Sequence, residues 1–155
     1  MTNNIMKKPK LLLKKTYLGL IKNSIGTRMF RSFYARTDKG MEDLLNDGEL
    51  SCAYFVSSIL KLFDWIDKPH LTIASTEAKL IKNGWEKIPV DKLKAGSIII
   101  WTEINIGGKY NRHIGFYIGN NETVSASYKL KRVVSHDPTF NGKREIEAVY
   151  WKDLK

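Results

Sequence analysis

The sequence predicts an α+β fold in which N-terminal helices pack on an antiparallel β-sheet. In the first half of the chain, apolar residues recur at helical spacing, and in the second half they follow the alternation of strands. The chain has 155 residues and is 43% apolar, which fits one compact domain. Its 17 aromatic residues exclude a disordered or low-complexity chain.

Helical spacing appears in three segments. Apolar residues at the 3.6-residue period, separated by lysines, predict a basic amphipathic helix within residues 11–25. A second helix is predicted from Cys52 to Phe63, with Ser51 as its N-cap. A short third helix is predicted over residues 76–82, closed by Asn83-Gly84.

Strand-like segments fill the second half of the chain. They are residues 97–102, 112–118, 122–128, 130–136 and 146–151. The turn Gly119-Asn120-Asn121 predicts that the second and third of these strands form a hairpin.

The charge divides the chain into two parts. Residues 1–40 hold ten cations and one acid, whereas residues 41–155 hold sixteen cations and fifteen acids. We therefore predict a basic N-terminal extension over residues 1–40, with a disordered lead at residues 1–10, and a near-neutral domain over residues 41–155. The extension either packs on the domain or contacts an anionic surface such as a membrane or wall polymer. Aromatic residues alternate with arginines in residues 28–36, but the uneven charge disfavours a nucleic-acid-binding protein.

Cys52 is the only cysteine, so the chain has no intramolecular disulfide and no CxxC metal or redox site. The three histidines lack ligand spacing, and neither a metal nor a cofactor is expected. The early apolar run Leu11–Leu13 is too short for a secretory signal. This predicts a cytoplasmic location, with unconventional export as the alternative.

Cys52 and His113 are the candidate reactive pair. At a helix N-terminus the macrodipole favours a thiolate and lowers the thiol pKa, although free cysteines are also common as small buried hydrophobes. His113 lies in a strand, and Gly115 follows on the same face. A glycine there lets another element approach closely, and the helix that carries Cys52 is the expected neighbour.

Four segments in order resemble the NlpC-type papain-like superfamily of cysteine peptidases and amidases, which includes cell-wall endopeptidases. They are Ser51–Val56 (SCAYFV), Leu93–Trp101 (LKAGSIIIW), His113–Asn120 (HIGFYIGN) and Thr123–Ser127 (TVSAS). The resemblance covers residues 47–128 and implies a papain-like domain over residues 41–155. It also implies that Cys52 is the nucleophile and His113 the base. Ser51 stands where the superfamily often has an acid.

The third catalytic position of the superfamily, twelve residues after the base, falls on Ser125. With an odd hairpin loop, residue 125 faces residue 115 and shares the face of His113, whereas a two-residue loop turns it away. His136 and Asp137, at the end of the next strand, are alternatives for this position.

The resemblance implies a cysteine hydrolase that cleaves an amide bond in a cell-wall-type peptide through an acyl-enzyme. Backbone N–H groups at the start of the helix, including that of Cys52, would bind the oxyanion, and Tyr34 is a candidate side-chain donor. A non-catalytic binding module on the same fold and a basic nucleic-acid-binding protein are the alternatives.

Overall fold

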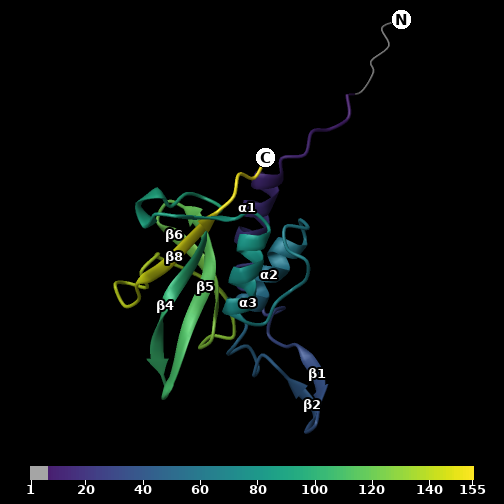
Figure 1. Ribbon diagram of the computed structural model, residues 1–155, viewed down its shortest axis with the longest axis vertical. Helices are drawn as coiled ribbons and strands as arrows, with labels where there is room; N and C mark the ends of the chain where they lie inside the picture. Colours follow the sequence, from purple (N-terminus) through teal and green to yellow (C-terminus); the bar gives the residue numbers. More distant parts are fainter. Residues whose placement is uncertain (1–6) are drawn as a thin grey trace, which may run out of the picture.

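The computed structural model describes residues 7–155, so the predicted disordered lead at residues 1–10 lies largely outside the described residues. The fold is α+β, as predicted, with helices packed beside an antiparallel sheet (Figure 1). The α-helices of the described part are α1 (Leu13–Asn23), α2 (Cys52–Lys61) and α3 (Ile73–Lys82). None of the helices in residues 7–155 is both long and apolar enough to cross a membrane.

Six strands form the main sheet in the order β3-β8-β4-β5-β6-β7, and each neighbouring pair is antiparallel. Their bounds are β3 Glu86–Ile88, β4 Ile98–Ile106, β5 Lys109–Gly119, β6 Glu122–Ser127, β7 Arg132–His136 and β8 Ile146–Trp151. All five predicted strands are present, and β4 and β5 extend further than predicted into a long hairpin that turns at Gly107-Gly108. Strand β3 was not predicted, because its three residues are too few to show alternation.

A separate two-stranded hairpin, β1 (Tyr34–Thr37) and β2 (Gly40–Asp43), was also missed. It projects away from the sheet below the helices (Figure 1). None of its residues is buried, so they carry no apolar alternation that would indicate a strand. Phe30, which precedes the hairpin, is buried in the core, whereas Tyr34 is 64% exposed.

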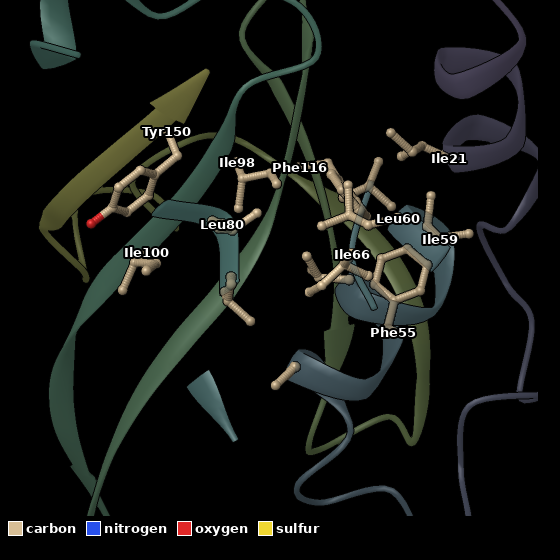
Figure 2. Close-up of a cluster of buried hydrophobic side chains, with 14 of the residues drawn as sticks. Ile21, Phe55, Ile59, Leu60, Ile66, Leu80, Ile98, Ile100, Phe116 and Tyr150 are labelled. Atoms are coloured by element: carbon tan, nitrogen blue, oxygen red, sulfur yellow. The ribbon is translucent and has the colours of Figure 1, made fainter. Parts of the chain in front are cut away.

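The core lies between the helices and one face of the sheet (Figure 2). Helix α2 contributes Phe55, Ile59 and Leu60, and the facing strands contribute their inward residues. These sheet residues are Ile98, Ile100, Ile114, Phe116, Val124, Ala126, Ala148 and Tyr150. Phe55 and Phe116 meet edge to face, with ring centroids 5.4 Å apart.

Helix α1 belongs to this same core. Tyr17 and Ile21 are fully buried, and the Tyr17 hydroxyl donates a hydrogen bond of 3.2 Å to the Gly96 carbonyl. The Tyr17 ring also packs edge to face on Phe116 and Trp65. The basic helix therefore packs on the domain, and residue 40 marks a change in charge rather than a break in the core.

The β5–β6 register decides which residues meet. Phe116 pairs with Val124, which places Ser125 opposite Gly115, on the same face as His113. The loop has only two residues, because Gly119 pairs with Glu122, and a bulge between Tyr117 and Gly119 rather than an odd loop produces this register. A Cβ added at Gly115 would lie 2.8 Å from the Ser125 Cβ and 2.7 Å from the Val124 carbonyl oxygen. The element that approaches this glycine is thus β6. The prediction that the helix carrying Cys52 does so is wrong, because α2 packs on the opposite face of β5, through Phe116.

Candidate active site

Cys52 is the first residue of α2, as the sequence predicts, and it is half-buried against the core. The predicted N-cap is not formed. Ser51 has helical backbone angles, and its hydroxyl donates a hydrogen bond of 3.0 Å to the Gly48 carbonyl. No side chain of the described residues therefore caps α2, and the N–H groups of its first turn are left without an intrahelical acceptor.

His113, Ser125 and His136 form a continuous chain of hydrogen bonds across three neighbouring strands. The His113 Nε2 lies 2.9 Å from the Ser125 hydroxyl, which lies 2.8 Å from the His136 Nε2. The His136 Nδ1 lies 2.8 Å from the Asp137 carbonyl oxygen and 2.8 Å from the Thr123 hydroxyl. Two of the three residues considered for the third position are thus linked in series to His113 through their side chains.

The carbonyl of Asp137 determines the direction of every bond in this chain. A carbonyl only accepts, so the His136 Nδ1 must carry the proton, and the Nε2 of neutral His136 must accept. The Ser125 hydroxyl then donates to His136 and accepts from the Nε2–H of His113. Neutral His113 is therefore protonated on Nε2, and its Nδ1 keeps a free lone pair.

Asp137 does not take the third position through its carboxylate. That group instead accepts hydrogen bonds from the backbone N–H groups of Thr139 and Asn141, which shape the loop over residues 137–144. The loop covers the histidines: the Phe140 ring stacks on His136 with centroids 3.7 Å apart. The buried indole of Trp101 donates a hydrogen bond of 2.7 Å to the Pro138 carbonyl and so holds the loop to the sheet.

A cavity of about 630 Å³ borders both members of the candidate pair. Cys52 of α2 and His113 of β5 line it, together with residues from the loops before α2 and α3 and from the β4–β5 hairpin. Within the described residues, no hydrogen bond joins the thiol to the imidazole. Tyr34 does not line the cavity, because it lies on the exposed β1–β2 hairpin.

Burial shifts the pKa of each reactive group toward its neutral form. It raises the pKa of the Cys52 thiol, while the N–H groups of Ile114 and Ala53 oppose this shift. Burial, helped by the positive charge of Arg144, lowers the pKa of His113 to about 3. The pKa-lowering effect expected of the helix N-terminus is outweighed by burial, so the site holds a neutral thiol beside a neutral imidazole.

Arg144, which the sequence analysis missed, also lines the cavity and is only 8% exposed. Its guanidinium donates hydrogen bonds to the Thr102 and Asn111 carbonyls. These partners lie 42 and 33 residues away in sequence, so no local motif marks the arginine.

No family model matches the chain, and no curated protein matches it in sequence. Among solved structures, NlpC2 from Trichomonas vaginalis is similar, with a TM-score of 0.58 and 16% sequence identity over 94% of this chain. The chain spans about half of that protein, 49% of its length. At this level of identity the likeness shows the fold alone, and that fold is NlpC-like.

Proposed function

We propose that the protein is a papain-like cysteine hydrolase that cleaves an amide bond, with Cys52 as nucleophile and His113 as general base. The observation that carries the proposal is the 2.9 Å hydrogen bond between the His113 Nε2 and the Ser125 hydroxyl. This bond holds the Nε2, so the nitrogen left to accept a thiol proton is the Nδ1. Cys52 and His113 border the same cavity, which is where a substrate would meet them.

The neutral state of both groups favours a general-base route over a preformed ion pair. On substrate binding, the thiol proton passes to the His113 Nδ1 as the sulfur attacks the carbonyl carbon. The carbon–nitrogen bond then breaks, and His113 returns the proton to the leaving nitrogen. Water hydrolyses the thioester and regenerates the thiol. The contact between Cys52 and His113 tightens when substrate binds, as catalytic hydrogen bonds often do.

The uncapped start of α2 supplies the oxyanion site. The backbone N–H groups of Cys52 and Ala53 lie in the first turn, where an intrahelical acceptor is lacking. Because the Ser51 hydroxyl bonds to Gly48, it does not compete for these donors. They are therefore available to the negative oxygen that develops when the sulfur attacks. Tyr34 has no part in this proposal.

The Ser125–His136 chain is proposed to orient the base. Ser125 is the third residue, and His136 acts behind it as a positioning residue. The resemblance of the four sequence segments supports a substrate of the cell-wall peptide type.

The test uses 4-nitrophenyl acetate as an acyl donor. We expect a burst of nitrophenolate and an acetyl group on Cys52 in the wild type, and neither in Cys52→Ala. His113→Gln should slow the burst about 100-fold or more, which is the usual contribution of a general base. Ser125→Ala should slow it roughly tenfold, in line with the loss of one hydrogen bond.

His70→Gln is the matched control. His70 has the same 8% exposure as His113, but it lies outside the cavity wall, with its ring bonded to Asp67. This variant should keep the wild-type burst. An unchanged burst in His113→Gln, or acetylation of another residue, would contradict the proposal.

A further inference from the structure

Arg144 is a buried cation to which the proposed reaction assigns no role. It is 8% exposed, and within residues 7–155 no carboxylate lies at salt-bridge distance from it. Its side chain donates hydrogen bonds from Nε and Nη2 to backbone carbonyls, and within residues 7–155 the Nη1 donates none. A buried charge without a counter-ion is costly, so this arrangement calls for an anion.

The other two cations of the cavity wall are either paired with carboxylates or exposed to solvent. Arg112 is held by two carboxylates, with Glu77 at 3.0 Å and Glu147 at 2.6 Å. Lys109 is exposed to solvent. Arg144 is thus the cavity cation that combines burial with an unused donor. Arg144 lines the same cavity as Cys52 and His113, and its positive charge lowers the pKa of both groups.

We propose that Arg144 binds a carboxylate of the substrate next to the scissile amide, so that the preferred acyl group is anionic. The inference rests on the proposed function, because it names the class of substrate that would bind in the cavity bordered by Cys52 and His113. A planar guanidinium with a free edge matches a carboxylate by two parallel hydrogen bonds. Its two bonds to the Thr102 and Asn111 carbonyls hold the group rigid, which lowers the entropic cost of binding.

The test compares two alkylating agents that differ mainly in charge, iodoacetate and iodoacetamide. With either reagent the Cys52 sulfur–carbon bond forms, the carbon–iodine bond breaks and iodide leaves. Both rates scale with the thiolate fraction, so their ratio cancels the thiol pKa and reports the anion site alone. Glutathione provides the ratio for a free thiol.

In the wild type we expect a ratio about tenfold above that of glutathione, equivalent to about 1.4 kcal/mol. Arg144→Met should bring the ratio down to the glutathione value or below. Lys143→Met is the matched control: it removes the same charge from the neighbouring exposed residue and should keep the wild-type ratio. Arg144→Lys should give an intermediate ratio, since an ammonium keeps the charge but loses the planar fork.

If Arg144→Met fails to fold, an experiment on the wild type alone still tests the proposal. Sodium acetate, compared with sodium chloride at equal ionic strength, should lower the ratio by competing with iodoacetate. A wild-type ratio equal to that of glutathione would overturn the proposal. So would a folded Arg144→Met in which both rates fall equally, because the arginine would then act on the thiolate alone. A raised ratio without an acetyl burst would leave the anion site standing and reject the hydrolase.

Discussion

Replacing Gly115 with alanine should push β6 away from β5 at the point where His113 and Ser125 meet. The new methyl group would lie 2.7 Å from the Val124 carbonyl oxygen and 2.8 Å from the Ser125 Cβ. Ordinary contacts begin at 3.4 Å, so β6 must move by about 0.6–0.7 Å. Trp101, at 3.1 Å, blocks relaxation on the other side. Overpacking of this kind costs about 1–3 kcal/mol of unfolding free energy.

The same movement would stretch the 2.9 Å bond between His113 and Ser125 to about 3.5 Å, beyond the range of a good hydrogen bond. Urea unfolding followed by tryptophan fluorescence measures the stability, and the acetyl burst measures the site. We expect Gly115→Ala to lower both.

Gly19→Ala in α1 is the control, since nothing lies within 4 Å of the added Cβ. That variant should be more stable than the wild type by about 0.5–1 kcal/mol, because alanine favours a helix. If the unfolding free energy of Gly115→Ala lies within about 0.5 kcal/mol of the wild-type value, the inference that β6 approaches Gly115 closely is wrong.

Three further predictions follow from burial. Because the pKa of His113 is about 3 in the fold and 6.5 when unfolded, the unfolding free energy should fall as pH drops from 6.5 to 3, by about 3–5 kcal/mol from this residue. His113→Gln should flatten that slope in urea titrations, and parallel slopes would reject the burial argument. The ultraviolet absorbance of the thiolate, with Cys52→Ala as blank, should show a pKa above the ordinary 9.0, whereas a lower midpoint would indicate a preformed ion pair. Tyr17→Ala should cost about 3–5 kcal/mol, whereas Leu12→Ala, at a side chain 59% exposed, should change stability by less than about 0.5 kcal/mol.

The elements that the sequence predicted are those with a strong local period. Helix α2 and the β5–β6 hairpin have enough apolar residues to fix their faces. The register that brings Ser125 opposite Gly115 comes from a bulge between Tyr117 and Gly119, which the sequence pattern does not reveal. The position of Cys52 at the start of α2 follows from the same period. The β1–β2 hairpin has no buried face, so its sequence carries no such signal.

The surroundings of the site depend on contacts between distant segments. The sequence posed Ser125, His136 and Asp137 as alternatives, but the sheet order places their groups in one chain of hydrogen bonds. Arg144 reaches the cavity only because the loop over residues 137–144 folds back across the sheet. The Ser51 prediction was wrong because a nearby carbonyl, that of Gly48, takes its hydroxyl.

The packing of α1 in the core determines how its lysines would bind an anionic surface. A cationic tail on a flexible linker only raises the local concentration of a domain near an anionic surface. In this protein Tyr17 and Ile21 fix the helix to the sheet, and Lys14, Lys15 and Lys22 face solvent. Binding of those lysines to an anionic surface would therefore fix the orientation of the whole domain relative to that surface. Binding through α1 would also determine which way the cavity faces, because the helix and the sheet share one core and move together.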